Sequence, residues 1–259
     1  MNKPIQFSTA PFFRRPLREA FRHIADAGYS SVEVMVTHDP ATQEPGPLAE
    51  TAAEFGLSVD TIHAPFLVFT RRVFGSDPIG KVEKTASLAR EVGAGTVVIH
   101  PPYRWQYPYR RWVEHGIGEL MAETGVSIAV ENMFPLRLGG SRAGLRLHDG
   151  HLLPDDSPLV LDTSHAAVSG LSPSEAHGRL GRRVRHIHLS NNAGKGWDSH
   201  LPLDRGVLPI AEFLTELSGN GYDGTISLEL DLRPYDEDAL HGVLTRNREF
   251  CERRTFLPS

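Results

Sequence analysis

The sequence predicts an α/β fold, a single (β/α)8 TIM barrel, from three observations. Eight strand-like segments alternate with helix-like segments along the chain, and this alternation is typical of a parallel sheet. The length of 259 residues suits one closed barrel. The first predicted strand is not followed by a Gly-x-Gly-x-x-Gly turn, which weakens the alternative of a doubly wound, dinucleotide-binding sheet. We therefore expect residues 1–259 to form one domain without a nucleotide cofactor.

The predicted strands are short apolar runs rich in β-branched residues. In chain order they cover residues 4–9, 31–36, 58–64, 96–100, 127–133, 159–163, 184–190 and 225–230. Start and stop residues such as Asp77, Gly93 and Ser172 mark the helices between them. The predicted helices cover residues 16–27, 48–55, 78–92, 109–123, a segment beginning at 172, 209–217 and 238–253, with a short helix near 145–153.

Composition restricts the function classes. The net charge of −5 and the pI of about 6.2 give no overall basic footprint for nucleic acid. The only cysteine is Cys251, which excludes a disulfide framework and suits a reducing compartment. No apolar run approaches the length that spans a membrane, and the N-terminus lacks the apolar core of a signal peptide. We expect a cytoplasmic enzyme with no membrane partner.

Nine acidic or imidazole side chains fall at the ends of the last six predicted strands, or in the segments that follow them. They are His63, His100, Glu131, Asp162, His165, His188, Asp198, His200 and Glu229. In a parallel barrel these strand ends face one mouth. Unpaired, so many ionisable groups in a partly buried cup would be costly. Divalent metal ions explain them, because carboxylate oxygens and imidazole nitrogens are ordinary ligands of zinc, manganese and iron.

Several neighbouring residues can be interpreted either as structural or as functional. A lone histidine at a strand end is usually a hydrogen-bonded core or rim residue, so only the joint placement favours metal binding. His186 shares a face with His188 but lies deeper, which favours a packing or ligand-supporting role. Glu33 is either a polar core residue or a substrate contact. Tyr103 and Trp105, just after a strand end, form either a substrate-binding wall or a packed loop.

These residues resemble a known superfamily. HAPF, VIHPP, AVEN, LDTSHA, HIHLSN, Asp198-Ser199-His200 and SLEL, in this order, are similar to the xylose isomerase-like TIM-barrel superfamily, which includes AP endonuclease family 2. The resemblance covers nearly the whole chain. Sugar isomerases and epimerases of this superfamily hold one metal ion with four side chains. The resemblance assigns that role here to Glu131, Asp162, His188 and Glu229.

The endonuclease IV branch implies a different metal site, with three zinc ions and all nine positions matched. By this resemblance, the ligand groups would be His63, His100 and Glu131; Glu131, Asp162, His188 and Glu229; and His165, Asp198 and His200. Phe66 would lie in the segment that enters DNA. The chain departs from this branch after His200, where it lacks a Leu-Gly-Glu-Gly run. The DNA-gripping loops are not recognisable either, so nucleic acid is not the favoured partner.

We expect a metal-dependent hydrolase that acts on a phosphoester, either a small phosphodiester or abasic-site DNA. Up to three zinc ions, or manganese or iron, would form the cluster, since clustered ions suit phosphate chemistry. The alternative is a sugar or sugar phosphate isomerase/epimerase that uses one divalent ion and Glu131 and Glu229 as its acid–base pair. A catalytically silent binding barrel is disfavoured, because structural metal sites are usually fully closed. Ligand type leaves oxidative chemistry at clustered iron open.

Overall fold

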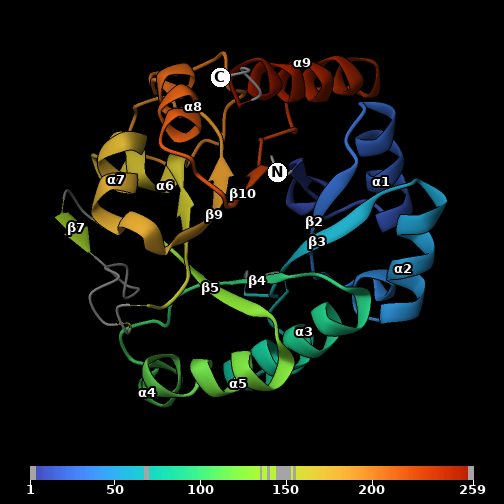
Figure 1. The fold of residues 1–259 in the computed structure, drawn as a ribbon, viewed down its shortest axis with the longest axis vertical. Helices are drawn as coiled ribbons and strands as arrows, with labels where there is room; N and C mark the ends of the chain where they lie inside the picture. Colours follow the sequence, from blue (N-terminus) through green and yellow to red (C-terminus); the bar gives the residue numbers. More distant parts are fainter. Residues whose placement is uncertain are drawn as a thin grey trace.

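A computed structural model of the chain describes residues 4–66, 70–134, 136–138, 141–143, 153 and 156–255. Eight parallel strands close into a barrel in the order β1-β10-β9-β8-β5-β4-β3-β2 (Figure 1), which confirms the predicted fold class. The barrel strands are β1 (Ile5–Ser8), β2 (Ser31–Met35), β3 (Ser58–His63), β4 (Thr96–Ile99), β5 (Ser127–Glu131), β8 (Leu159–Asp162), β9 (Val184–Leu189) and β10 (Thr225–Leu228). Each agrees with a predicted strand to within two residues at either end.

Helices surround the barrel, as Figure 1 shows. The α-helices are α1 (Leu17–Asp26), α2 (Pro45–Glu54), α3 (Pro78–Val92), α4 (Tyr107–His115), α5 (Ile117–Thr124), α6 (Thr163–Val168), α7 (Pro173–Leu180), α8 (Ile210–Gly219) and α9 (Glu237–Thr255). Short 3-10 helices are η1 (Ala10–Phe12), η2 (Pro40–Thr42) and η5 (Gly181–Arg183). None of the helices in the described ranges is both long and apolar enough to cross a membrane.

The predicted start and stop signals work as expected at α3 and α7. Asp77 accepts a hydrogen bond from the backbone N–H of Gly80, and Gly93 ends α3 with a left-handed backbone at φ 81°. At α7, Ser172 and Glu175 form a capping box in which each side chain accepts a backbone N–H at the other residue. Local chemistry therefore sets these helix boundaries before any packing is considered.

Three features differ from the sequence predictions. The helix predicted over residues 109–123 is divided at Gly116, where a Cβ atom would lie 2.6 Å from Cδ1 of Trp112. The short helix α6 was not predicted; the side chain of Asp162 caps it. An antiparallel pair, β6 (Leu136–Leu138) and β7 (Ser141–Ala143), was also not predicted. Residues 145–152 of the helix predicted near 145–153 lie outside the described residues.

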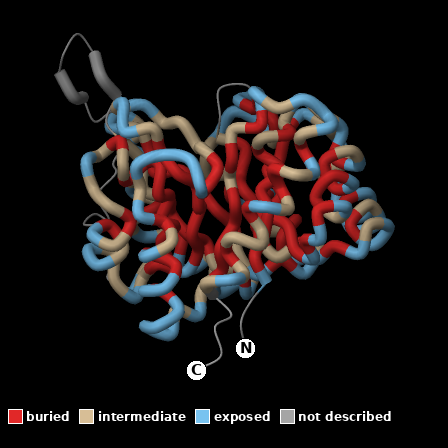
Figure 2. The backbone as a smooth tube through the Cα atoms, turned by 90° about the horizontal axis from the view of Figure 1, so that it is seen from above, coloured by how far each residue is buried: buried red, intermediate tan, exposed pale blue. Residues whose placement is uncertain are grey.

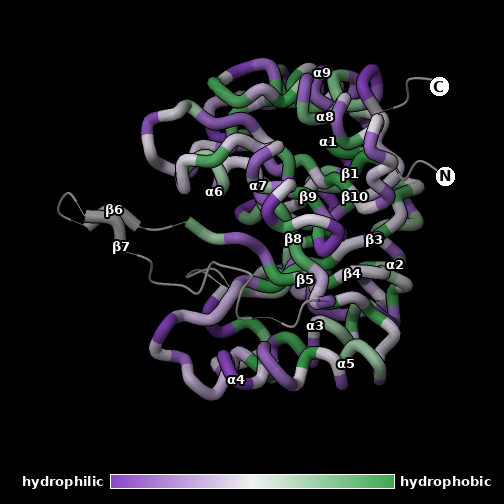
Figure 3. Tube along the Cα trace, turned by 60° about the vertical axis from the view of Figure 1, so that its left-hand side comes forward, coloured by the Kyte–Doolittle hydropathy of each residue, from purple (hydrophilic) through white to green (hydrophobic). Residues whose placement is uncertain are grey.

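The hydrophobic core lies between the strands and the helices. Buried segments occupy the interior and exposed segments the periphery (Figure 2), and hydrophobic residues concentrate on the strands (Figure 3). Fully buried side chains such as Phe7, Ile62 and Leu161 belong to this core. Because strand side chains alternate, the residues next to them point into the barrel. This alternation places the polar strand residues inside the barrel.

Candidate metal centre

The carboxyl ends of six strands deliver ionisable side chains to one mouth of the barrel. His63, Glu131 and Asp162 are the last residues of β3, β5 and β8, whereas His100 and Glu229 directly follow β4 and β10. The remaining four of the nine predicted residues lie on β9, on α6 and in the segment after β9; they are His188, His165, Asp198 and His200. The distances below show that the described structure brings all nine together.

The central group surrounds Nδ1 of His188 with three carboxylates. This nitrogen lies 3.1 Å from Oε1 of Glu131, 3.4 Å from Oε2 of Glu229 and 3.9 Å from Oδ2 of Asp162. Ligand atoms of Glu131, Asp162 and His188 lie within 4.8 Å of one another and could hold a metal ion. Oδ2 of Asp162 is buried and accepts no hydrogen bond within the described part of the chain. The group therefore offers oxygens and a nitrogen to one shared point.

A second group lies on the β3 and β4 side of Glu131. Nε2 of His100 is 3.0 Å from Oε2 of Glu131, and Nε2 of His63 is 3.8 Å from the same oxygen. These three buried residues are also close enough to hold an ion. Phe66, which follows β3, lies beside His100 with ring centroids 6.2 Å apart and stacks on Tyr109. Glu131 is thus shared between two candidate groups.

A third group combines Asp162 with residues of α6 and the segment after β9. Nε2 of His200 lies 2.8 Å from Oδ2 of Asp198, and Nε2 of His165 lies 3.4 Å from the same oxygen. Asp162, His165, Asp198 and His200 satisfy the distances for a metal group. His200 has a positive φ of 40°, a backbone conformation that is uncommon outside glycine and concentrates at functional sites.

Three of the histidines share one hydrogen-bond pattern. Nδ1 lies near a backbone carbonyl in His63 (Ala64 O, 2.9 Å), His165 (Asn132 O, 2.8 Å) and His200 (Glu229 O, 3.0 Å). A carbonyl only accepts, so each Nδ1 donates its hydrogen and Nε2 is left facing a carboxylate. Metal-binding histidines typically make this second hydrogen bond. The donor set and its tautomers therefore fit divalent metal ions.

The carboxylates also alter the pKa values of the imidazoles. Burial lowers the pKa of His188, but the charges of Glu33 and Glu131 outweigh it and raise the pKa well above its ordinary value. Against the same burial effect, Asp162 and Asp198 raise the pKa of His165 to about 10. Negative charge in the cup thus attracts protons when no other cation is bound. A metal ion at these nitrogens must displace them.

Glu33 and His186 extend the site below His188. Glu33 is fully buried inside the barrel, and its Oε2 lies 2.7 Å from Nε2 of His186 and 3.1 Å from Nε2 of His188. His186 therefore supports the site from below the mouth, as its position on the strand suggested. Sequence reasoning left the role of Glu33 open. Its place within the apolar strand SVEVM was the available signal, because an acid there requires a buried partner.

The predicted aromatic wall lies at the rim. Tyr103 and Trp105, in the segment after β4, stack with ring centroids 4.8 Å apart, and Trp105 is 58% exposed. The assignment of Phe66, Tyr103 and Trp105 to substrate binding stays a prediction, as does the metal role of the nine residues.

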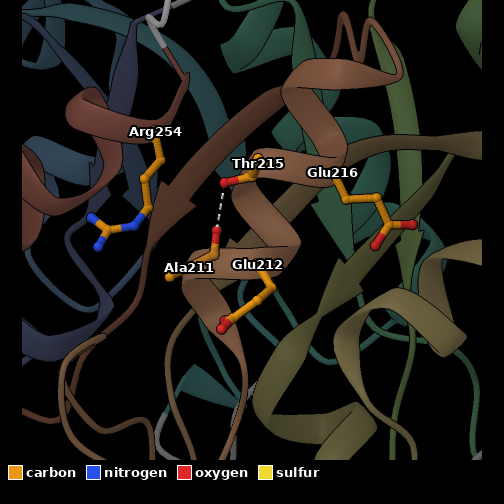
Figure 4. Close-up of a pocket in the computed structure, with 5 residues that line it drawn as sticks. All are labelled: Ala211, Glu212, Thr215, Glu216 and Arg254. Atoms are coloured by element: carbon orange, nitrogen blue, oxygen red, sulfur yellow. Dashed lines mark hydrogen bonds between the residues drawn. The ribbon is translucent and has the colours of Figure 1, made fainter.

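One pocket lies away from these groups, against α8 and α9. It is lined by Ala211, Glu212, Thr215, Glu216 and Arg254 (Figure 4). Polar groups in its lining have partners: Thr215 donates to the carbonyl of Ala211, Glu216 accepts from Ser174, and Arg254 donates to the carbonyl of Phe250. None of the nine candidate ligands lines it, so it carries no argument about the metal centre.

Barrel and site together define a class: a (β/α)8 barrel with a carboxylate–imidazole centre at its carboxyl mouth. Residues 21–247 match the model of the family described as xylose isomerase-like TIM barrel. The chain belongs to this family, which confirms the resemblance deduced from the sequence motifs.

Sequence relatives and solved structures agree with this placement. A Mycobacterium tuberculosis protein described as uncharacterized is 33% identical over 246 residues, covering 87% of this chain and 88% of that protein. Fructoselysine 3-epimerase of Escherichia coli O157:H7 is 21% identical over 268 residues, covering 95% of each. Among solved structures, a D-tagatose 3-epimerase-like protein has a TM-score of 0.71 at 20% identity, covering 97% of this chain and 99% of that one. L-ribulose 3-epimerase has a TM-score of 0.67 at 17% identity, covering 98% and 95%.

These comparisons correct the expected reaction. The expected hydrolysis of a phosphoester, whether a small phosphodiester or abasic-site DNA, was wrong. The relative with a stated activity is fructoselysine 3-epimerase, and similar solved structures include ketose 3-epimerases. The error came from counting ligands: the nine groups do converge, but convergence alone does not specify phosphate chemistry. The alternative expectation, a sugar isomerase or epimerase, is the better supported one.

Proposed function

We propose that the protein is a metal-dependent isomerase or epimerase that acts on a sugar or sugar phosphate. The observation that carries this proposal is the single imidazole nitrogen, Nδ1 of His188, enclosed by the carboxylates of Glu131, Asp162 and Glu229. The epimerases among its relatives and structural neighbours support the reaction class.

Glu131, Asp162, His188 and Glu229 would hold one divalent ion. Such an ion, when bound, polarises the oxygens of a substrate and makes the C–H between them more acidic. Carboxylate oxygens with one imidazole suit manganese, iron or zinc. We assign the catalytic ion to these four residues because the three carboxylates all face Nδ1 of His188.

Glu131 and Glu229 are the proposed acid–base pair. Burial raises the pKa of Glu131, yet His165 and His188 lower it overall to well below its ordinary value. Burial raises the pKa of Glu229, only partly opposed by His188 and His200. One carboxyl group is therefore set to take a proton and the other to return one, a division typical of acid–base pairs. Removal on one side of the substrate and return on the other would invert a carbon centre.

The flanking residues would bind the rest of the substrate. With their protons retained, His63, His165 and His200 can donate hydrogen bonds from Nε2 to hydroxyl oxygens. The carboxylate of Asp198 can accept hydrogen bonds from hydroxyl groups. The exposed stack of Tyr103 and Trp105 offers an apolar face to the C–H bonds of a sugar ring. A sugar-like molecule presents both kinds of surface.

Metal counting and isotope exchange test this proposal together. Elemental analysis of protein made without chelator or histidine tag should find about one ion per chain. The ion should be retained in His200→Ala and lost in Glu131→Ala. In D2O, ketoses, fructoselysine and ketose phosphates should be screened for deuterium incorporation beside the carbonyl, which Glu229→Gln should abolish.

Two outcomes would contradict it. About three ions per chain, falling in His200→Ala, would move the flanking residues from substrate binding to metal binding. No exchange with any tested ketose or ketose phosphate, on protein that holds its ion, would reject the isomerase and epimerase assignment.

A further inference from the structure

Glu33 on β2 is a fully buried carboxylate whose described partners are two histidines. Its Oε2 lies 2.7 Å from Nε2 of His186. Nε2 of His188 lies 3.0 Å from Oε1 and 3.1 Å from Oε2, and its hydrogen-bond geometry assigns the bond to Oε2. Both imidazoles are themselves fully buried. The carboxylate therefore acts on these rings rather than on solvent or substrate.

The hydrogen bonds determine which nitrogen of each ring carries a hydrogen. An ionised carboxylate only accepts, so Nε2 of both His186 and His188 must donate. Nδ1 of His186 lies 2.5 Å from the hydroxyl of Thr225, which can donate to it.

Without metal, Nδ1 of His188 is also hydrogen-bonded to a carboxylate, Oε1 of Glu131. An ion held by the central carboxylates would replace the hydrogen on Nδ1, whereas Nε2 keeps its hydrogen toward Glu33. Nδ1 faces Glu131 at 3.1 Å and Glu229 at 3.4 Å. Turning the ring over about the Cβ–Cγ bond would put the carbons Cδ2 and Cε1 where Nδ1 and Nε2 now lie. Both the hydrogen bond to Glu33 and the nitrogen that faces the central carboxylates would be lost. A carboxylate behind a ligating imidazole also increases the basicity of the ligand.

We propose that Glu33 is a positioning residue that fixes the orientation of His188 and makes Nδ1 the ligating atom. This inference rests on the proposed function, because it needs an ion at the central group. Glu33 itself contacts neither the ion nor the substrate. A purely structural role, in which Glu33 only stabilises the buried pair of rings, would change protein stability without changing metal affinity.

The test measures zinc affinity and ring tautomers, not turnover. Zinc Kd is obtained by competition with a chelator, and 15N NMR of labelled histidines identifies the protonated nitrogen of His188. In the wild-type protein we expect zinc on Nδ1 and hydrogen on Nε2. Glu33→Ala should weaken zinc binding about 10- to 100-fold, a typical loss when the partner of a metal ligand is removed.

Glu33→Gln is the second variant and keeps the shape of the side chain. Both Nε2–H groups bond to Oε2, and an amide oxygen in that place can accept from both, but it carries no negative charge. We expect a smaller loss of zinc affinity than in Glu33→Ala, with the hydrogen of His188 still on Nε2. Thr61→Val is the matched control: Thr61 pairs with Glu33 across β2 and β3 and is equally buried. Its substitution should leave the zinc Kd unchanged.

Each outcome separates this inference from the proposed function. Zinc that does not shift the His188 signals in the wild-type protein would overturn both. Zinc on Nε2 of wild-type His188 would overturn the inference alone, even if neither variant folds. So would an unchanged Kd in folded Glu33→Ala.

Discussion

The layer of side chains directly below the metal centre is apolar on one side of the barrel and polar on the other; we call the two sides the apolar half and the polar half. Most residues of this lower layer lie two positions before a residue of the metal centre on the same strand. The others, Gln6 and Glu33, pair in the sheet with Ser227 and Thr61, which do. The apolar half consists of Val98, Ala129 and Val160, which form a separate buried cluster. The polar half consists of Gln6, Glu33, Thr61, His186 and Ser227, all fully buried. The two halves support different ligands.

The difference shows what each ligand type needs from below. Glu131 and Asp162 stand above Ala129 and Val160, which offer no hydrogen bonds, so only groups at their own level can orient these carboxylates. His188 stands above His186 and receives support from Glu33. An imidazole has two distinct nitrogens, and one must be occupied for the other to bind reliably. A carboxylate has no such requirement.

Substitution of Glu131 should have the largest effect on metal binding and activity. Its carboxylate contacts His100, which stands above the apolar half, and His188, which stands above the polar half. Glu131→Gln should lose the bound ion and lower kcat by at least about 10³-fold, since it removes a ligand and a proton acceptor together. Elemental analysis and deuterium exchange measure the two losses. The control is Glu123→Gln, at an exposed position of α5. If Glu131→Gln kept both the ion and the activity, Glu131 would be neither a metal ligand nor the residue that links the two halves.

The second-largest effect is expected from pH, on the free energy of unfolding of the metal-free protein. The pKa of His165 is raised from 6.5 to about 10 by Asp162 and Asp198, although burial opposes the rise. The folded state thus binds its proton more tightly than the unfolded state. The resulting stabilisation is complete below pH 6.5 and is lost as the pH rises through about 10.

The measurement is the unfolding free energy of metal-free protein between pH 6.5 and pH 10, with His165→Asn as the comparison. Stability should fall with rising pH, and less steeply in the variant. Zinc affinity should rise over the same range, because the ion competes with the protons. Stability that does not depend on pH in this range would show that the imidazoles of the cup are neutral without metal.

Much of this arrangement could be predicted from the sequence. Strand–helix alternation specifies the barrel, and the barrel brings every strand end to one mouth, so residues as distant in sequence as His63 and Glu229 were placed together before any distance was known. Phosphoester hydrolysis was wrongly expected because ligand number does not encode substrate. Whether a barrel of this kind binds a phosphoester or a sugar depends on the shape and contacts of the rim of its mouth.

Other features were not predicted because they depend on side-chain contacts that the strand and helix patterns do not encode. Glu33 meets His188 across the barrel, and no local pattern encodes that pair. The helix over residues 109–123 divides at Gly116, where the Trp112 ring leaves no room for a Cβ atom. Asp162 looked like a ligand alone, but it also caps α6 through the N–H of His165.

A substitution in the apolar half should affect stability alone. Val160→Ala removes hydrocarbon from a fully buried position and should lower the free energy of unfolding by about 2 kcal/mol. Chemical denaturation measures this loss. The ion content should not change, because Val160 offers no hydrogen bond to a ligand. Loss of the ion at unchanged stability would mean that the apolar half also positions ligands.

The smallest effect is expected at the rim above the apolar half. Trp105 is 58% exposed and stacks on Tyr103, so Trp105→Ala should change the free energy of unfolding by less than about 0.5 kcal/mol. If its ring contacts the substrate, KM should rise about fivefold, equivalent to ~1 kcal/mol of lost contact, with kcat unchanged. Steady-state kinetics on the substrate found by isotope exchange measures both constants. A fall in kcat at constant KM would place Trp105 in the chemical step, whereas no change in either would limit it to the packing of its loop.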